Sequence, residues 1–408
     1  MKNCKYRRIG IYGISCTGKT TLAKQMEKLN PYQYKFMDGS SVINDVCEGG
    51  LAAFKKLPAE HKYQCRKAAI RYLEQLQKKE QKHLIIAGHY SFFSNDNFEI
   101  AWTDADENFY TDIIIINDDI DTVYQRCINL GKKYSKTDLK KWNHFENSKL
   151  ANLQKEIYRV KSNKVIDRAF EILEEMNKRI ILDDTRRLIP DSYDTFLLFD
   201  ADGTIIANDS ARFMQKYLQD AGPEKIKQIF KQYPQYEFKA FWEVANHYSK
   251  NNDISTFKTA YKNAAKEIKI RDEFLKLLSL PDVNKIIVSA GFSELWKYLL
   301  KKYNINDVSV ISGNTLYDKY LIGDKEKGYI VDLLRTHNKK VISFGDGLVD
   351  RYMLEKSDMA FLIINDKFRS INKYLDKIKN LRYLSFSGLE LEGIKKTTID
   401  EIINLIKA

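Results

Sequence analysis

The sequence has little proline, little cysteine and no long apolar run. Only 6 of the 408 residues are proline and 30% are charged, which favours a folded, helix-rich protein without long disordered tracts. No segment approaches the roughly 18 apolar residues of a membrane span, so no membrane partner is expected. The five cysteines all lie in the first third of the chain: Cys4, Cys16, Cys47, Cys65 and Cys127. Their odd number and the absence of a CxxC spacing predict free thiols in a reducing compartment and argue against a metal cluster.

The N-terminus places basic residues before an apolar stretch, as a signal peptide does. Gly18-Lys19-Thr20 interrupts the stretch early, and no small-residue cleavage site follows. We therefore expect residues 8–12 to form the first strand of a cytoplasmic domain.

The chain is longer than one hydrophobic core usually organises. Short β-branched runs alternate with longer amphipathic segments, which predicts an α/β fold with two doubly wound parallel-sheet domains. The polar stretch 184–194 separates them, so we place one domain at 1–188 and the other at 189–408. Predicted strands lie at 8–12, 35–37, 83–87, 112–116 and 179–182, and then at 195–199, 285–288, 308–312, 340–344 and 359–364. Residues 208–280 show only helical periodicity, which predicts an all-helical cap inserted in the second domain.

Residues 13–20, GISCTGKT, match the pattern G-x-x-x-x-G-K-[ST] between a predicted strand and a predicted helix. In such a loop, backbone N–H groups converge on phosphate oxygens, Lys19 neutralises the β and γ phosphates, and the Thr20 hydroxyl binds Mg²⁺. The predicted nucleotide-binding residues are Gly13, Ser15, Cys16, Thr17, Gly18, Lys19, Thr20 and Thr21. This half of the chain resembles the compact P-loop kinases of nucleosides, nucleotides and polynucleotides. The resemblance implies ATP or GTP as phosphoryl donor and an acceptor that lies over the sheet.

Two further residues match positions that such kinases use. Asp38 ends the second predicted strand, where an acidic group orients or deprotonates the acceptor hydroxyl; a plain Asp-Gly turn explains it equally well. Arg126 lies where a lid arginine stabilises charge on the transferring phosphoryl group. Three lysines follow within ten residues, namely Lys132, Lys133 and Lys136. They either share that role or form a solvated basic face. Arg66 is a weaker candidate for binding an acceptor phosphate.

The third predicted strand ends without the carboxylate that often helps to coordinate Mg²⁺ in P-loop proteins. The sequence there is LIIAGHYSF, so His89 follows the strand instead. His89 is either an acceptor-site residue or an ordinary loop histidine.

A pair of carboxylates, Asp200 and Asp202, follows the predicted strand at 195–199 in the sequence DADGT. Further polar residues end later strands or begin a helix, in the order Ser289, Lys327, Asp346 and Asp350, with Lys325 and Lys319 as weaker alternatives to Lys327. This ordered set resembles the haloacid dehalogenase superfamily. The position of the cap resembles its phosphoserine-phosphatase-like branch.

The resemblance implies a phosphatase mechanism. Asp200 would attack phosphorus to form an aspartyl-phosphate, and Asp202 would protonate the leaving alkoxide and later activate water. Ser289 and Lys327 would bind the phosphoryl oxygens. Mg²⁺ would reduce the repulsion between the two anions, and the predicted metal-binding residues of this site are Asp200, Asp202, Asp346 and Asp350.

The order of the two domains is similar to that of phage polynucleotide kinase-phosphatases, which heal nucleic-acid ends. The net charge of +12 suits a nucleic-acid partner, whereas the large helical cap fits it less well. Two other interpretations stay open. One is a small-molecule kinase fused to a nucleotide or sugar phosphatase, and the other is a P-loop regulatory module that gates the phosphatase.

Overall fold

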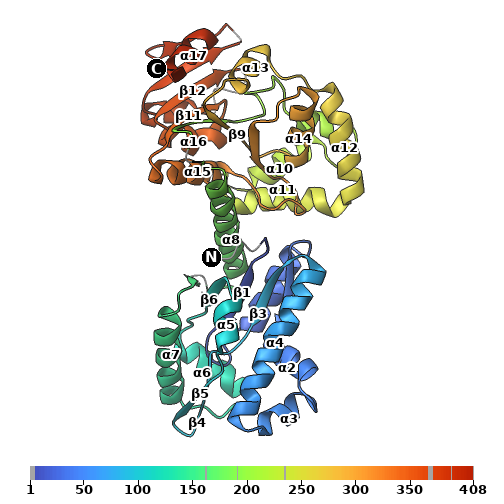
Figure 1. The fold of residues 1–408 in the computed structure, drawn as a ribbon, viewed down its shortest axis with the longest axis vertical. Coiled ribbons are helices and arrows are strands. Elements are labelled where there is room, and N and C mark those ends of the chain that lie inside the picture. Colours follow the sequence, from blue (N-terminus) through green and yellow to red (C-terminus); the bar gives the residue numbers. More distant parts are fainter. Residues whose placement is uncertain are drawn as a thin grey trace. The chain divides into compact units, whose positions relative to one another are not determined.

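The computed structural model describes residues 5–160, 163–190, 192–233, 236–365, 371–386 and 388–407. By its internal contacts the chain divides into two compact units, Met1–Glu174 and Glu175–Ala408 (Figure 1). Each unit contains a parallel sheet accompanied by helices, so the predicted fold class is confirmed. No helix among the described residues is both long and apolar enough to cross a membrane.

The first unit has a five-stranded sheet in the order β2-β3-β1-β6-β7, and all its strand pairs are parallel. The strands are β1 (Arg8–Tyr12), β2 (Tyr34–Asp38), β3 (His83–Ala87), β6 (Asp112–Ile115) and β7 (Glu156–Arg159). The helices are α1 (Lys19–Leu29), α2 (Gly39–Val46), α3 (Gly50–Lys56), α4 (Ala59–Glu80), α5 (Asp104–Phe109), α6 (Ile120–Asn129) and α7 (Lys136–Ala151). An antiparallel hairpin of β4 (Ser91–Ser94) and β5 (Asn97–Ile100) follows β3.

The second unit has a seven-stranded parallel sheet in the order β10-β9-β8-β11-β12-β13-β14. The strands are β8 (Thr195–Phe199), β9 (Asn284–Ser289), β10 (Val308–Ser312), β11 (Lys340–Gly345), β12 (Met359–Ile364), β13 (Leu381–Ser385) and β14 (Lys395–Lys396). The helices outside the cap are α14 (Ser293–Lys302), α15 (Asp324–Thr336), α16 (Arg351–Lys356) and α17 (Ile399–Lys407), with the 3-10 helices η1 (Leu348–Asp350) and η3 (Asn372–Lys377). The cap consists of α9 (Ala211–Met214), α10 (Pro223–Lys231), α11 (Phe238–Asn251), α12 (Ile254–Glu267) and α13 (Asp272–Leu278). Its described residues contain helices and no named strand, as predicted.

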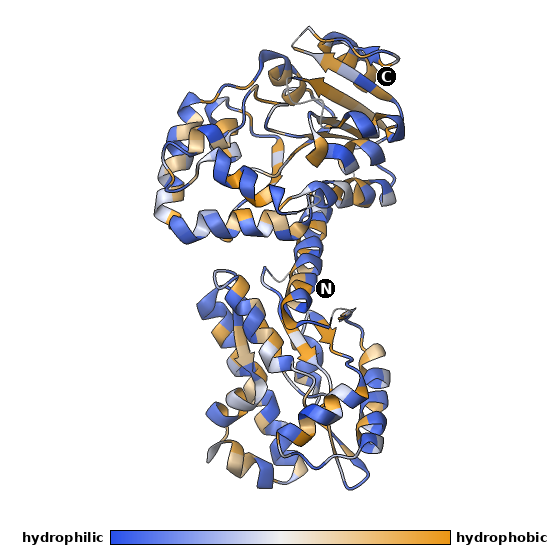
Figure 2. Cartoon of the chain, turned by 180° about the vertical axis from the view of Figure 1, so that it is seen from behind, coloured by the Kyte–Doolittle hydropathy of each residue, from blue (hydrophilic) through white to orange (hydrophobic). Residues whose placement is uncertain are grey.

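Strand β8 lies inside the sheet between β9 and β11 and is buried from Phe196 to Phe199, which is typical of a parallel sheet covered on both sides. Figure 2 shows several strands in orange, the colour of hydrophobic residues, whereas much of the surface of the helices is blue. Phe196 and Leu198 pack into one apolar cluster, whereas Leu197 and Phe199 pack into another. Because successive side chains of a strand point to opposite faces, one short run contributes to both cores. Polar residues that directly follow such a strand therefore stand at the edge of a rigid core.

The strand predicted at 179–182 is wrong, because these residues belong to helix α8 (Val165–Arg187). The buried residues of α8 recur at helical spacing, and Met176, Ile180 and Ile181 continue a pattern that begins earlier in the helix. Ile180 and Ile181 pack in the core of the second unit. For this reason the contacts divide the chain inside α8, earlier than the predicted boundary at 188.

The four described cysteines are free thiols, namely Cys16, Cys47, Cys65 and Cys127, and Cys4 lies outside the described residues. The sulfur atoms of Cys47 and Cys65 are 2.7 Å apart.

Candidate functional site

Asp200 lies at the carboxyl end of the strand β8, between β9 and β11. Its backbone N–H donates to the Phe344 carbonyl of β11 at 2.8 Å. β9 ends at Ser289, and β11 is followed by Asp346, so both residues reach the same edge of the sheet. This edge is where open parallel sheets bind their ligands.

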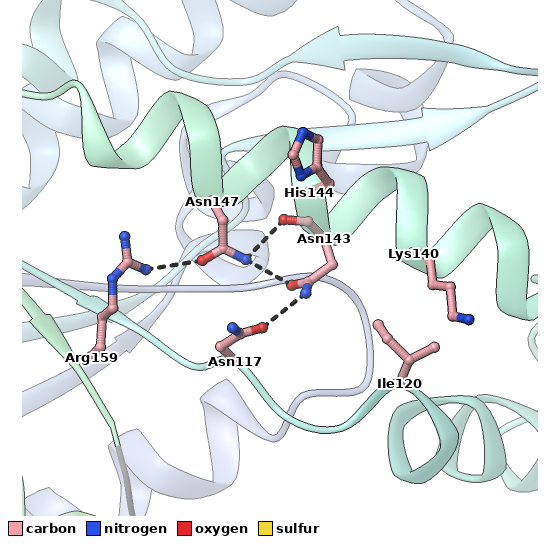
Figure 3. A pocket seen from close by; sticks show the side chains of 7 residues that line it. All are labelled: Asn117, Ile120, Lys140, Asn143, His144, Asn147 and Arg159. Carbon is pink, nitrogen blue, oxygen red and sulfur yellow. Dashed lines mark hydrogen bonds between the residues drawn. The ribbon is translucent and has the colours of Figure 1, made fainter.

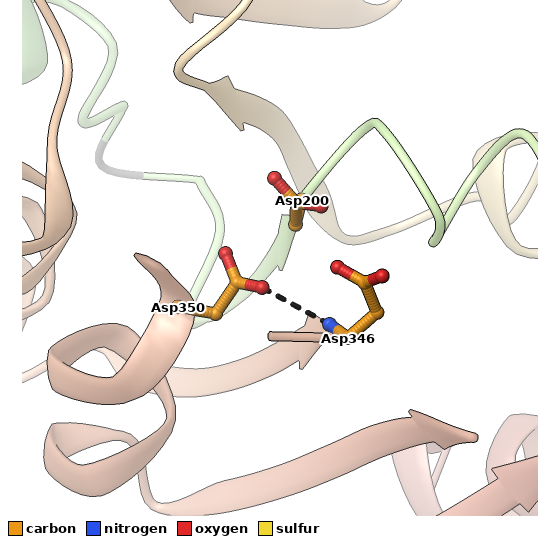
Figure 4. Close-up of side chains that lie close together, drawn as sticks. All are labelled: Asp200, Asp346 and Asp350. Carbon is orange, nitrogen blue, oxygen red and sulfur yellow. Dashed lines mark hydrogen bonds between the residues drawn. The ribbon is translucent and has the colours of Figure 1, made fainter. Parts of the chain in front are cut away.

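Three carboxylates converge at this edge (Figure 4). Asp200, Asp346 and Asp350 are buried, and one carboxylate oxygen of each lies within 4.8 Å of those of the other two. The Lys327 ammonium donates to Asp200 Oδ1 at 2.5 Å and to Asp350 Oδ1 at 2.7 Å. The structure therefore brings together four of the residues that the sequence analysis selected.

The charges in this cluster do not balance. Burial lowers the pKa of Lys327, but the Asp200 and Asp350 carboxylates outweigh burial and raise it, so Lys327 stays charged. The pKa of Asp200 is raised well above its usual value by burial and then by the charge of Asp350, against the opposing effect of Lys327. If all three carboxylates are ionised around one ammonium, the cluster carries excess negative charge, and the raised pKa of Asp200 reflects burial together with this repulsion. A hard divalent cation with oxygen ligands, such as Mg²⁺, fits this donor set.

Hydrogen bonds fix the orientation of two of these carboxylates. Asp350 Oδ2 accepts from the backbone N–H groups of Asp346 at 3.0 Å and Gly347 at 3.1 Å. Asp346 Oδ2 accepts from the Asn365 side-chain amide at 2.7 Å, and the same amide reaches the Gly203 carbonyl at 3.2 Å. Sequence reasoning missed Asn365; the available signal was its place directly after a buried strand, the position that the other polar residues of the site share.

Gly203 gives the loop after β8 its shape. Its φ of +81° is in the left-handed region, and a Cβ at this position would lie 2.1 Å from Asp346 Oδ2. The loop can approach the carboxylate cluster this closely only because residue 203 is a glycine.

Asp202 and Ser289 lie beside the cluster. The Asp202 carboxylate accepts from the backbone N–H of Ser210 at 2.7 Å and from its hydroxyl at 2.9 Å. Ser289 is buried, and its hydroxyl accepts from the backbone N–H of Gly291 at 3.0 Å. A Cβ on Gly291 would lie 3.1 Å from Ser289 Oγ and 3.2 Å from Asp202 Oδ2, so the Gly291 backbone lies close to both side chains. The group of three clustered carboxylates does not include Asp202.

The three lysines considered from the sequence occupy different positions. Lys327 reaches Asp200, as described above, whereas the Lys319 ammonium binds Asp184 Oδ1 at 2.5 Å. Lys325 lies two residues before Lys327 on α15. Lys327 is therefore the lysine that can act on a group bound at Asp200.

In the first unit, the loop between β1 and α1 has the geometry of a phosphate-binding loop. Gly13 and Gly18 adopt positive φ values of 145° and 88°. The Lys19 ammonium is buried and donates to the carbonyls of Gly13 at 2.6 Å and Ile14 at 2.8 Å. Burial lowers the pKa of Lys19 to about 8, and the charge of Glu146 opposes this shift. A cation held in a loop before a helix N-terminus suits an incoming phosphate group.

Asp38 ends β2 next to this loop. The Thr20 hydroxyl donates to Asp38 Oδ2 at 3.3 Å, while Asp38 Oδ1 accepts from the backbone N–H groups of Ser40 and Ser41. Asp38 is thus both the N-cap of α2 and the carboxylate in contact with the hydroxyl predicted to bind metal.

The basic residues predicted for the lid and for the acceptor phosphate differ in their contacts. Arg126 donates to Asp118 Oδ2 at 2.6 Å and to the Cys16 carbonyl at 3.5 Å, and Lys132 donates to the Ser15 hydroxyl at 3.1 Å. Lys136 instead pairs with Asp121 at 2.6 Å. Arg66 pairs with Glu99 at 2.7 Å. Arg126 and Lys132 are therefore the two basic residues of this set that contact the loop.

Glu146 is a buried carboxylate that the sequence analysis missed. Its Oε1 accepts from the Ser91 backbone N–H at 3.0 Å and from the Ser91 hydroxyl at 3.2 Å. Burial raises its pKa, and the charge of Lys19 opposes this shift. No sequence signal distinguishes one glutamate in the middle of a helix.

A separate pocket of about 420 Å³ opens in the first unit (Figure 3). Its lining residues come from the segment after β6, from α6, from α7 and from β7, and are Asn117, Ile120, Lys140, Asn143, His144, Asn147 and Arg159. Hydrogen bonds link Asn117 to Asn143, Asn143 to Asn147, and Asn147 to Arg159. The pocket contains none of the predicted site residues.

Two protein-family models match the chain. Residues 12–146 match the model described as AAA domain, and residues 197–355 match the model described as haloacid dehalogenase-like hydrolase. These matches confirm that a kinase-like P-loop domain is joined to a haloacid dehalogenase-like domain. The search of curated proteins finds no match.

Several solved structures are similar to one part of the chain each. A phosphoserine phosphatase as a phospho-aspartyl intermediate analogue is 17% identical, with a TM-score of 0.32, and the match covers 52% of this chain and 99% of that one. A phosphoserine phosphatase from T. onnurineus is 13% identical, with a TM-score of 0.35 and coverage of 54% and 97%. Shikimate kinase from Acinetobacter baumannii is 13% identical, with a TM-score of 0.33 and coverage of 43% and 95%.

Proposed function

We propose that this protein is a bifunctional phosphoryl-transfer enzyme, because it joins a kinase-like P-loop domain to a haloacid dehalogenase-like hydrolase domain. Its first unit would transfer phosphate from ATP or GTP to an acceptor. Its second unit would hydrolyse a phosphomonoester. The observation that carries the proposal is the buried group of Asp200, Asp346 and Asp350 around Lys327.

In the second unit, Asp200 is the proposed nucleophile. Its position after β8 leaves the carboxylate at the sheet edge, where attack on phosphorus forms an aspartyl-phosphate and releases an alkoxide. Asp202, held by Ser210, donates the proton to that alkoxide and then takes a proton from the attacking water. Lys327 and Ser289 bind the phosphoryl oxygens. Asp200 and Asp346 would hold Mg²⁺, which supplies positive charge against the repulsion between phosphate and carboxylate.

In the first unit, the loop around Lys19 would bind the donor phosphates. Lys19 would exchange the carbonyls of Gly13 and Ile14 for phosphate oxygens, and Thr20 would hold the magnesium ion of the nucleotide. Asp38 would orient or deprotonate the acceptor hydroxyl, and Arg126 would stabilise the charge on the transferring group.

Two substitutions test the two activities separately. Asp200→Asn should abolish the hydrolysis of p-nitrophenyl phosphate and leave ATP binding unchanged. Lys19→Ala should abolish transfer of labelled γ-phosphate and leave that hydrolysis unchanged. Hydrolysis that survives in Asp200→Asn would exclude the covalent mechanism, and transfer that survives in Lys19→Ala would place the kinase site elsewhere.

For the substrate, we propose nucleic-acid ends, phosphorylated at the 5′-hydroxyl and dephosphorylated at the 3′-phosphate. The net charge of +12 supports this choice, because phosphate-rich partners attract a basic protein. The test is an oligonucleotide with a 5′-hydroxyl and a 3′-phosphate, incubated with ATP and Mg²⁺. If neither end changes while a nucleotide or sugar phosphate is hydrolysed, end healing is excluded.

The helical cap favours a second candidate, a small-molecule kinase fused to a nucleotide or sugar phosphatase. The cap is inserted between Asp202 and Ser289, as expected where a cap encloses a small substrate. A panel of nucleotides and sugar phosphates, assayed beside the oligonucleotide, distinguishes the two candidates.

A further inference from the structure

Two side chains of the first unit leave a buried polar atom without a hydrogen-bond partner. Glu146 is 1% exposed and accepts from Ser91 through Oε1, while its Oε2 has no hydrogen-bond partner within the described part of the chain. His89 Nδ1 is likewise buried and unpaired there. Buried polar atoms in folded proteins are nearly always paired, so two of them in one region indicate a place for a ligand.

The two residues belong to one packed group. Trp142 lies one helical turn before Glu146 on α7, and its indole N–H donates to the Ser91 hydroxyl at 3.0 Å, the same group that Glu146 binds. The His89 and Trp142 rings are stacked, with centroids 6.1 Å apart and planes inclined by 22°. Glu146 and His89 are therefore linked through Ser91 and Trp142.

This group adjoins the phosphate-binding loop. Trp142 packs in the same apolar cluster as Ile14 of the loop. The segment that carries His89 begins where Gly88 donates its backbone N–H to the Ile11 carbonyl of β1 at 3.1 Å. The electrostatics agree, because burial and then the charges of Lys19 and Lys132 lower the pKa of His89. The unpaired atoms thus lie beside the place where the donor phosphates would bind.

We propose that His89 and Glu146 form the subsite for an uncharged, sugar-like hydroxyl group of the phosphoryl acceptor. The inference rests on the kinase activity proposed above. A hydroxyl group donates to Glu146 Oε2, and it can pair with either tautomer of His89 because it both donates and accepts hydrogen bonds. A phosphate or carboxylate at this point would be repelled by the buried carboxylate.

The test compares matched acceptors with labelled ATP and Mg²⁺. Adenosine, cytidine, ribose, glucose and a 5′-hydroxyl oligonucleotide present an uncharged hydroxyl group as the acceptor. AMP and CMP present their 5′-phosphate, and transfer to it is measured as formation of ADP or CDP. Wild type, Glu146→Gln, His89→Asn and the control Glu60→Gln are assayed side by side. Glu60 is exposed on α4, accepts a hydrogen bond from the Gln64 side chain and has no proposed role.

We expect transfer to a member of the uncharged set. Glu146→Gln should raise the KM for that acceptor about tenfold, equivalent to about 1.4 kcal/mol, and should leave the KM for ATP within about twofold. Glu60→Gln should match wild type. A glutamine at position 146 keeps the acceptor oxygen for Ser91, so a purely structural role would change the melting temperature and not the acceptor KM. If Glu146→Gln does not fold, His89→Asn provides the same comparison.

Two results would overturn the inference and leave the kinase function standing. One is transfer to AMP or CMP and to no uncharged acceptor. The other is the same acceptor KM in wild type, Glu146→Gln and His89→Asn. Absence of transfer to every acceptor, with ATP bound, would instead reject the kinase function and this subsite together.

Discussion

Lys327 is the residue on which the buried charges of the second unit depend. It is 1% exposed and is bound to two buried carboxylates, Asp200 and Asp350. Lys327→Met would leave both carboxylates without their cation, and removing one partner of a buried pair costs about 3–5 kcal/mol. We expect the free energy of unfolding of this unit to fall by that amount in denaturant titrations without Mg²⁺.

Lys319→Met is the matched control for this substitution. Lys319 also pairs with an aspartate, Asp184, but it is 39% exposed. Its loss should cost less than about 1 kcal/mol, because exposed ion pairs contribute little to stability. Equal losses in the two variants would mean that the pairs around Lys327 do not support the fold.

Gly203 is a second single residue on which the geometry of the carboxylate cluster depends. Gly203→Ala would place a methyl group on Asp346 Oδ2 and would strain a backbone with φ of +81°. We expect weaker Mg²⁺ binding in calorimetric titration and slower hydrolysis of p-nitrophenyl phosphate. Gly222→Ala is the control, since a Cβ there meets nothing within 4 Å. Unchanged Mg²⁺ affinity in Gly203→Ala would show that the loop can move away from Asp346.

The residues that the sequence predicts are those that belong to a spaced pattern. Asp200 and Asp346 directly follow apolar runs that predict strands, and Asp350 lies four residues after Asp346, so their meeting at one sheet edge could be predicted. Asn365 and Glu146 each contribute one polar group, and the packing of the folded chain decides which atoms that group contacts. Nothing in the order of residues shows that α7 places Glu146 against Ser91.

At the scale of elements, helix α2 depends on the same carboxylate that contacts Thr20. Asp38→Asn keeps a good N-cap, so the free energy of unfolding should change by less than about 0.5 kcal/mol. The loss of its charge should nevertheless slow phosphate transfer by about 10²–10⁴-fold if Asp38 is the base. Asp38→Ala should cost about 1 kcal/mol more in stability, measured by denaturant unfolding. Full transfer activity in Asp38→Asn would restrict Asp38 to the capping role.

Strands were predictable where apolar residues form an uninterrupted run. β8 and β12 are apolar throughout or nearly so, and their predicted bounds are confirmed. β7 and β13 were missed because charged residues interrupt the apolar run in their sequences, EIYR and LRYLS. The apolar residues 180–182 gave the opposite error, since Ile180 and Ile181 are the buried face of α8.

At the scale of the whole molecule, each unit has its own apolar core and its own candidate site. The clusters around Ile113 and Ile14 belong to the first unit, and those around Leu197 and Phe196 to the second. Separate cores allow separate unfolding transitions. A ligand that binds one site should therefore stabilise the unit that contains it.

Calorimetric melting of the full chain with selective ligands tests this independence. Mg²⁺ alone should raise the melting temperature of the second unit, because it binds the carboxylate cluster of the folded state. At a Mg²⁺ concentration one hundred times the dissociation constant, the free energy of unfolding should increase by about 2.7 kcal/mol. ATP with Mg²⁺ should additionally raise the transition of the first unit. Asp346→Asn should remove the first shift only, and Lys19→Ala the second only. If either substitution removes both shifts, the two sites are coupled and the units do not act as independent enzymes.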